Sequence, residues 1–120
     1  REAKFFEDET GTQPVKEWLD SLKPKRKVEF TKISARIKRA QQGNFGAHRF
    51  ISGALGELKV DYGPGYRVYF GLDGDDFILL LHGGTKETQQ EDIVLAEERW
   101  GQYLQKKQIG KSNVQNKKNQ

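Results

Sequence analysis

The segment from Gly56 to Gly84 constrains the fold more than any other part of the sequence. It contains three strand-like runs, GELKVDY, GYRVYFGL and DFILLLHGG, separated by the glycine-containing turns GPG and DGD. Short runs of β-branched, aromatic and apolar residues bounded by such turns are typical of strands joined by tight hairpins. The sequence therefore predicts a meander of three antiparallel strands.

The residues before the meander show the periodicity of helices. Pro14 suits a first helical turn, and apolar residues follow it at spacings of three, one and three: Val15, Trp18, Leu19 and Leu22. Between Lys25 and about Gln42 a second stripe recurs at three, four and three: Phe30, Ile33, Ile37 and Ala40. We expect two amphipathic helices, preceded by a first strand in AKFFEDETG and followed by a long connection, QQGNFGAHRFISGALG, that contains four glycines.

The residues after the meander predict one more helix and a tail. Thr88 and Glu91 have the spacing of a capping box, and an apolar stripe follows: Ile93, Ala96, Trp100 and Leu104. Residues 107–120 are rich in Lys, Gln and Asn, so we expect a basic, disordered tail. Residues 1–106 then form one α+β domain, in which two N-terminal helices and a C-terminal helix pack on a small antiparallel sheet.

Positive charge is concentrated in the middle of the chain. Residues 23–67 carry eleven Lys/Arg against three Asp/Glu, within a chain of 120 residues whose net charge is +4. Lys32, Arg36 and Arg39 recur at four and three along the second helix and form a cationic ridge beside its apolar stripe. Such a ridge suits a polyanion such as RNA, although charge alone favours a solvated helix face.

Composition excludes several classes of site. The chain has no cysteine, so it forms neither disulfides nor thiolate metal sites, which is compatible with a reducing cytosol. The longest apolar run, FILLLH, is far too short to span a membrane. The Asp residues near position 74 lack calcium-loop spacing, and neither a P-loop nor a nucleophile elbow is present. We expect a soluble cytoplasmic protein that uses no metal or other cofactor and no membrane.

Side-chain alternation decides the register of the first hairpin. A two-residue turn at Gly63 and Pro64 would place Val60 beside Arg67 and mix apolar with charged residues on one face. A three-residue loop, Gly63 to Gly65, pairs 62 with 66 and 60 with 68, which keeps the apolar residues together. We predict the second register, with Asp61 opposite Arg67 and Lys59 opposite Tyr69 on an exposed face. Ordinary cross-strand pairing, at about 0.2–1 kcal/mol per pair, is the simpler explanation of that face.

The register of the second hairpin leaves His82 with two possible orientations. A two-residue turn at Asp73 and Gly74 directs His82 to the face of Arg67, whereas a three-residue loop directs it inward. A histidine on the Arg67 face would suit proton transfer, but a single histidine at a strand end is more often structural.

The meander and the segment after it resemble the RelE/ParE toxin superfamily of bacterial toxin–antitoxin modules. The matching motifs are Glu57-Leu58-Lys59, GPGYRVY at 63–69 and GGTK at 83–86, followed by Gln89, Gln90, Asp92 and Ile93. The resemblance covers residues 4 to 104 and is strongest to the HigB-like, phage-derived addiction module killer branch. It implies a RelE-like fold and a type II toxin that cuts mRNA on the ribosome without a metal. It also implies neutralisation by a cognate antitoxin, expected to be a helix-turn-helix protein.

The resemblance also implies roles for individual residues. Arg67 would stabilise the charge on the scissile phosphate, and Lys59 and Lys86 would assist or move protons. Some family members carry a tyrosine where this chain has Asp92, and Tyr69 or His82 would take its place. The residues expected to contact RNA are basic: Lys32, Arg36, Arg39 and Arg49. Burial of Arg67 in the helix-packed core would contradict a contact between Arg67 and an RNA phosphate.

Two alternatives use the same fold without nuclease chemistry. One is a ParE-like inhibitor of DNA gyrase. The other is a decayed, non-toxic module that retains only antitoxin binding.

Overall fold

The computed structural model describes the backbone of residues 1–118 and the side chains of residues 1–110. The α+β class predicted from the sequence is confirmed. The elements in chain order are β1 (Glu2–Phe5), α1 (Pro14–Leu22), α2 (Lys27–Gln41), β2 (His48–Ser52), β3 (Leu55–Val60), β4 (Tyr66–Asp73), β5 (Phe77–Thr85), the 3-10 helix η1 (Lys86–Thr88) and α3 (Gln89–Lys118).

The five strands form one sheet in the order β1-β5-β4-β3-β2. β1 pairs parallel to β5, so the prediction of a purely antiparallel sheet is wrong for this strand, whereas the other neighbours pair antiparallel as predicted. β2 was not predicted, because it lies inside the glycine-rich segment that we expected to be a connection. It is only five residues long, between Gly46 and Gly53, which both have positive φ, and it gains its regular backbone pairing from β3.

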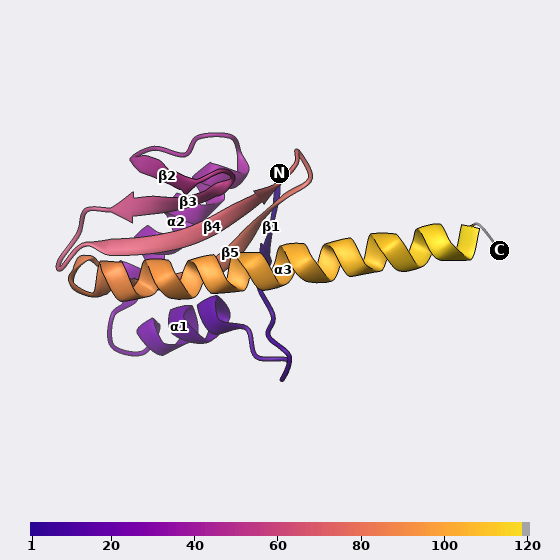
Figure 1. The fold of residues 1–120 in the computed structure, drawn as a ribbon. Helices are drawn as coiled ribbons and strands as arrows, with labels where there is room; N and C mark the ends of the chain where they lie inside the picture. Colours follow the sequence, from indigo (N-terminus) through magenta and orange to yellow (C-terminus); the bar gives the residue numbers. More distant parts are fainter. Residues whose placement is uncertain (119–120) are drawn as a thin grey trace.

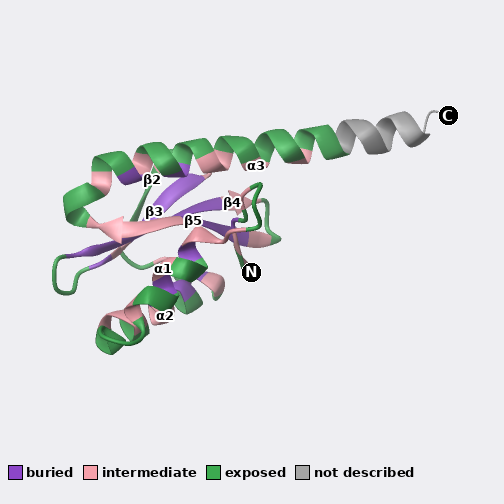
Figure 2. Ribbon diagram, turned by 90° about the horizontal axis from the view of Figure 1, so that it is seen from below, coloured by how far each residue is buried: buried purple, intermediate pink, exposed green. Residues whose placement is uncertain are grey.

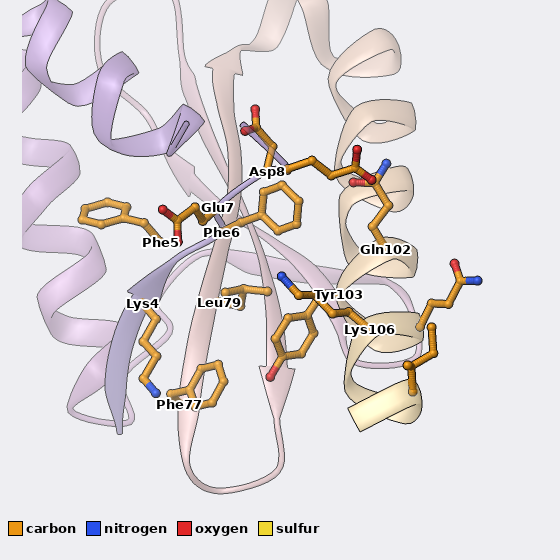
Figure 3. A pocket seen from close by; sticks show the side chains of 13 residues that line it. Lys4, Phe5, Phe6, Glu7, Asp8, Phe77, Leu79, Gln102, Tyr103 and Lys106 are labelled. Atoms are coloured by element: carbon orange, nitrogen blue, oxygen red, sulfur yellow. The ribbon is translucent and has the colours of Figure 1, made fainter. Parts of the chain in front are cut away.

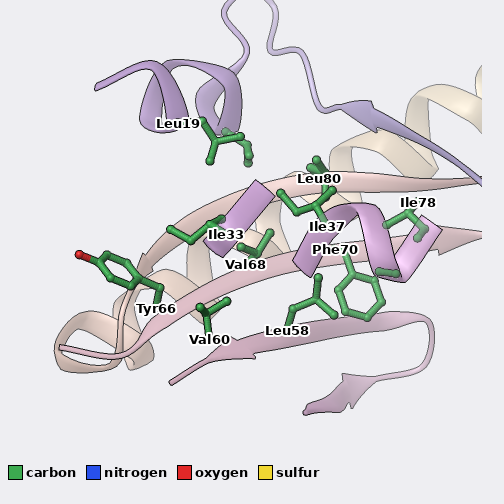
Figure 4. Close-up of a cluster of buried hydrophobic side chains, with 12 residues drawn as sticks. Leu19, Ile33, Ile37, Leu58, Val60, Tyr66, Val68, Phe70, Ile78 and Leu80 are labelled. Carbon is green, nitrogen blue, oxygen red and sulfur yellow. The ribbon is translucent and has the colours of Figure 1, made fainter. Parts of the chain in front are cut away.

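Helices cover both faces of the sheet (Figure 1, Figure 2). α1 and α2 cover one face, where the predicted stripe residues Val15, Leu19, Ile33 and Ile37 join a core with Leu58, Val68 and Phe70 (Figure 4). α3 covers the other face, where Ala96 packs with Phe6, Leu55, Tyr69 and Leu81. None of the helices in the described residues is long and apolar enough to cross a membrane.

A tryptophan fixes a helix to each face by packing on a strand glycine. A Cβ atom on Gly83 of β5 would lie 2.2 Å from Cε3 of Trp18 in α1, and a Cβ on Gly71 of β4 would lie 2.3 Å from Cε3 of Trp100 in α3. Separations this short are far inside van der Waals contact. The two glycines therefore create the space that each indole ring fills.

The first hairpin keeps the predicted faces but not the predicted register. Val60 pairs with Tyr66, and Lys59 pairs with Arg67, so the loop has five residues, 61–65, rather than three. A shift of two residues preserves side-chain alternation, which explains why the faces are right. The prediction that Asp61 faces Arg67 and that Lys59 faces Tyr69 is wrong, because Asp61 lies in the loop and Glu57 is the residue opposite Tyr69.

A β-bulge decides the orientation of His82. Asp73 pairs with Phe77, which gives the three-residue loop, and this loop alone would turn His82 inward toward α1 and α2. The pairing then steps from Phe70–Leu80 to Tyr69–His82, so Leu81 is the extra residue. His82 consequently lies on the face of Tyr69, which the loop length by itself did not predict.

The C-terminal helix differs from the prediction in two ways. α3 continues to Lys118 through the segment expected to be disordered, although the domain boundary at residue 106 stays a prediction. Ala96 is fully buried and Ile93 and Trp100 pack beside it as expected, but Leu104 is exposed and Tyr103 packs in its place. The Thr88 hydroxyl donates to the Asp92 carboxylate rather than forming the predicted capping box.

The fit of Trp100 on Gly71 predicts a specific cost for a methyl group. We expect Gly71→Ala to lower the free energy of unfolding by about 1–3 kcal/mol, because the indole ring must move out of its packed position. Gly101→Ala is the matched control, since a Cβ on Gly101 meets nothing within 4 Å in α3, and it should stabilise by about 0.5–1 kcal/mol. Urea denaturation of both variants measures the difference, and equal stabilities would contradict the packing described.

Candidate functional site

The tip of the first hairpin is joined to the start of η1. The backbone N–H of Lys86 donates to the carbonyl oxygen of Gly65 at 2.8 Å. Gly65 has a φ of +82°, and a Cβ there would lie 3.4 Å from Cβ of Lys86 and 3.6 Å from Nη1 of Arg67. A shallow hollow of about 360 Å³ is lined by residues 61–65 and Lys86. Gly65 thus brings the hairpin tip, Lys86 and Arg67 together.

Arg67 lies at this position without a carboxylate partner. Its side chain is buried, at 6% exposure, and Nη1 donates to the carbonyl oxygen of Tyr66 at 3.0 Å. Nε is buried and forms no hydrogen bond with any described residue, and no ion pair joins Arg67 to the described part of the chain. Buried cations are normally paired, since an unpaired buried charge is costly. An anion at the hairpin tip would supply the missing partner.

Two lysines add positive charge beside Arg67. Lys59 is directly opposite Arg67 in the register, which places two cations in a cross-strand pair that disfavours the folded sheet. Lys86 is exposed on the other side of Gly65, and Asp61 is the one carboxylate among the residues that line the hollow. The structure therefore brings together Lys59, Arg67 and Lys86, three of the five residues predicted to be catalytic.

The predicted exposure of this sheet face is wrong, because α3 covers it. Tyr69 and Glu57 are both 0% exposed, and Arg67 is nearly as buried. The apolar stripe of α3 needs a partner surface, and this face of the sheet provides it through Leu55, Leu79 and Leu81. Arg67 is thus buried between the sheet and α3, which is the outcome that contradicts the predicted open contact with an RNA phosphate. Its Nη1 approaches the hollow only beside Gly65, where a Cβ would lie 3.6 Å away.

Glu57 links the edge strand β2 to α3, a role that sequence reasoning missed. Its carboxylate accepts from Nε of Arg49 at 2.6 Å and from Nε2 of Gln89 at 3.0 and 3.2 Å. Arg49, predicted to contact RNA, is therefore ion-paired, although about half of its side chain is exposed. The sequence signal was an acidic residue in a largely apolar strand, with one partner on the preceding strand and the other 32 residues further along the chain.

Tyr69 is enclosed too completely for the predicted catalytic role. Its hydroxyl is buried and forms no hydrogen bond within the described residues. Burial raises the pKa of Tyr69, and the nearby carboxylates of Glu57 and Asp92 raise it further. The phenol thus keeps its proton at neutral pH and has no access to solvent.

His82 is held by hydrogen bonds at both ring nitrogens. Nη1 of Arg99 lies 2.7 Å from Nδ1, and Oδ1 of Asp92 lies 2.7 Å from Nε2. A guanidinium only donates, so Nδ1 accepts and Nε2 carries the proton that goes to Asp92. Thr88 donates to the second oxygen of Asp92 at 2.6 Å. His82 therefore connects β5 to α3 and has no free nitrogen for proton transfer.

The cationic ridge on α2 lies on the opposite face of the sheet from Arg67 and Lys59. The ammonium of Lys32 lies 4.9 Å above the ring of Tyr62, the guanidinium of Arg36 packs against Gly46, and Arg39 is exposed. Tyr62 belongs to the hairpin loop that lines the hollow. The cationic ridge of α2 and the cations Lys59, Arg67 and Lys86 therefore come nearest to each other at this loop.

A larger hollow of about 730 Å³ lies between β1 and the later turns of α3 (Figure 3). Aromatic and aliphatic side chains line much of it, among them Phe6, Phe77, Leu79 and Tyr103. Its α3 side is formed by residues between 102 and 109, whereas the hairpin tip contacts η1 before α3 begins, and the two hollows share no lining residue. Within the described residues, no group of three or more His, Cys, Asp or Glu side chains is arranged to hold a metal ion.

Comparison with known proteins places these features in a family. The model of the family described as "Phage derived protein Gp49-like (DUF891)" matches residues 17–101, which include every candidate site residue named above. The chain belongs to the Gp49-like family. It is also 46% identical over 76 residues to an uncharacterised protein of Haemophilus influenzae (strain ATCC 51907 / DSM 11121 / KW20 / Rd), covering 63% of this chain and 75% of that relative.

The contacts of Asp92 predict its contribution to stability. We expect Asp92→Ala to lower the free energy of unfolding by about 1–3 kcal/mol, because His82 and Thr88 both lose an acceptor at a buried position. Asp92→Asn should cost less, since its amide oxygen still accepts from His82. Glu97→Ala, an exposed acid on the same helix, should change stability by less than about 0.5 kcal/mol. Thermal denaturation measures the stability of all three variants. An Asp92→Ala variant as stable as Glu97→Ala would contradict a stabilising role for the hydrogen bonds of Asp92 to His82 and Thr88.

The buried hydroxyl of Tyr69 gives a second prediction. Tyr69→Phe should leave stability at pH 7 unchanged or raise it, because it removes a buried polar group that has no partner. Above pH 10 the wild-type protein should lose stability faster than Tyr69→Phe, because the unfolded tyrosine ionises there while the folded one, with its raised pKa, does not. Denaturation across this pH range tests both statements. A loss above about 1 kcal/mol at pH 7 would show that the hydroxyl donates to Glu57 instead.

Proposed function

We propose that this protein is the toxin of a type II toxin–antitoxin module and an mRNA endonuclease that acts on the ribosome without a metal. Two findings support the proposal. The chain belongs to the Gp49-like, phage-derived family, and its hairpin and GGTK motifs resemble those of RelE and HigB toxins. It acts in the cytoplasm, where its target is, and a cognate helix-turn-helix antitoxin binds and neutralises it.

One observation carries the proposal: Arg67 is a buried arginine that forms no ion pair with a carboxylate of the described residues, and its Nη1 lies beside Gly65, which lines the hollow together with Lys86. A site that binds a phosphate needs positive charge that is not already neutralised by the protein. The charge of Arg49 is neutralised by its ion pair with Glu57, whereas Arg67 forms no ion pair with a described residue. The scissile phosphate of RNA is the anion that we assign to this place.

The reaction requires two proton transfers and one site of charge stabilisation. The ribose 2′-oxygen attacks the adjacent phosphorus as it loses its proton, and the 5′-oxygen leaves as it gains one, so a 2′,3′-cyclic phosphate forms. Arg67 stabilises the charge on the pentacovalent phosphate. Because Tyr69 is enclosed and His82 has no free nitrogen, Lys59 and Lys86 are the groups assigned to proton transfer.

Burial of the predicted catalytic face favours a second candidate function. α3 covers Tyr69 and most of Arg67, so an RNA strand reaches Arg67 only at the hollow or after α3 moves. A toxin that binds its target, such as a ParE-like inhibitor of gyrase, needs no open catalytic face. A decayed module that only binds its antitoxin needs none either.

Expression of the protein alone, followed by mapping of mRNA 5′ ends, separates these functions. We expect growth arrest with new 5′ ends inside reading frames for the wild type. Arg67→Met keeps the apolar stem and volume of the side chain but removes the charge, and it should reduce cleavage by at least about a hundredfold, as loss of one stabilising group does elsewhere. Arg67→Lys should retain part of the activity.

Lys16→Ala is the control, because Lys16 is an exposed cation on α1, which covers the face of the sheet opposite Arg67, and it does not line the hollow. Its cleavage should equal that of the wild type. Arrest with intact mRNA and stalled gyrase–DNA complexes would reject the nuclease in favour of the gyrase inhibitor. Normal growth of cells containing folded protein would indicate the decayed module.

A further inference from the structure

The surface around β2 carries a cationic segment without acidic residues. From Phe30 to Gly56 the sequence holds five Lys/Arg and no Asp or Glu. Arg49 is paired with Glu57, and the other four, all on α2, form no ion pair with the described residues. β2 lies at the edge of the sheet opposite β1, next to the end of α2 (Figure 1). Arg36 extends from α2 to Gly46, two residues before β2, and would overlap any Cβ placed there. The positive charge of α2 therefore reaches the sheet edge.

Aromatic rings are gathered at the same edge. Phe45, His48, Phe50 and Phe70 form a connected cluster, with neighbouring ring centroids 5.5 to 5.8 Å apart. Phe70 is fully buried and anchors the cluster in the core, whereas Phe50 is 47% exposed and His48 is exposed. The two outer rings are therefore accessible to solvent and rest on a ring that is fixed in the core.

Local backbone features hold these outer rings in place. Gly56 lies between Phe50 and Phe70 in the strand register, and a Cβ there would be 2.7 Å from the Phe70 ring, so its bare backbone lets the two rings meet edge to face. Nδ1 of His48 donates to the carbonyl oxygen of Gly46 at 2.7 Å, because a carbonyl only accepts. Both exposed rings are therefore oriented before any ligand arrives.

We propose that Phe50 and His48 form a stacking platform for the bases of single-stranded RNA, whose phosphates contact the adjacent cations of α2. Exposed aromatic rings next to unneutralised cations are the combination that single-strand binding proteins use, because every base has a face that stacks. This proposal rests on the proposed function only in assuming that the protein binds RNA. It adds a contact made by bases rather than phosphates, away from the Arg67 hollow.

The alternative to RNA at this edge is a strand of another protein that pairs with β2 and extends the sheet. The structure disfavours this occupant, because a bulge between Phe50 and Ser52 interrupts the ladder and Gly53, with positive φ, ends the strand. A regular, uninterrupted edge would be expected for strand addition. The absence of acidic residues from this segment also favours a polyanion.

Fluorescence anisotropy with a labelled 2′-O-methyl oligouridine tests the platform, since this RNA analogue cannot be cleaved through its 2′-oxygen. Phe50→Leu keeps an apolar side chain but removes the aromatic face, and it should weaken binding by about 5- to 100-fold. Its salt dependence should stay that of the wild type. Phe50→Tyr should bind within about twofold of the wild type, and Arg36→Gln should reduce the log–log salt slope by about 0.7.

Val94→Ala removes a comparably exposed apolar side chain on the opposite face of the sheet and should leave binding unchanged. Equal affinities of wild type and Phe50→Leu, with both proteins folded by circular dichroism, would overturn the platform. This outcome is distinct from failure of the proposed function. Loss of binding in Phe50→Leu with no mRNA cleavage by the wild type would retain the platform and reject the nuclease.

Discussion

The packing of helices on both faces of the sheet is the constraint on which the rest of the structure depends. Trp18 and Trp100 fit onto Gly83 and Gly71 from opposite sides, so neither face of the central strands is left to solvent. Because α3 lies over β4 and β5, every polar group on that face must be satisfied by the protein or await a ligand. A buried polar group on this face that has no partner within the protein therefore marks a candidate ligand site.

Most polar groups under α3 are satisfied by partners within the chain. Glu57 receives Arg49 and Gln89, and His82 bridges Asp92 and Arg99. These contacts join strands to α3 and account for residues that would otherwise suggest chemistry. Among the described residues, Arg67 is a buried cation of this face that forms no ion pair, and its Nη1 lies beside Gly65 at the hairpin tip.

Two of the groups of cations in the described residues lie on opposite faces of the sheet. Lys59, Arg67 and Lys86 gather on the α3 side of the hairpin, while the ridge of α2 and the exposed rings of β2 lie on the other side of the sheet. The hairpin loop is where they approach, since Tyr62 lies under Lys32 and Gly65 touches Lys86.

The pattern of apolar and polar residues was enough to predict the α+β class, the two N-terminal helices with their buried stripes, and the faces of the first hairpin. These properties depend on periodicity within a few residues, which a register error of two leaves intact. The sequence did not predict β2, because its five residues form a strand only by pairing with β3. It also did not predict the bulge at Leu81 that places His82 on the face of Tyr69. Tertiary structure alone decided that α3 buries the Arg67 face and that Glu57 pairs with Arg49. The physical reason is that burial and ion pairing depend on which distant segments meet, and local patterns do not contain that information.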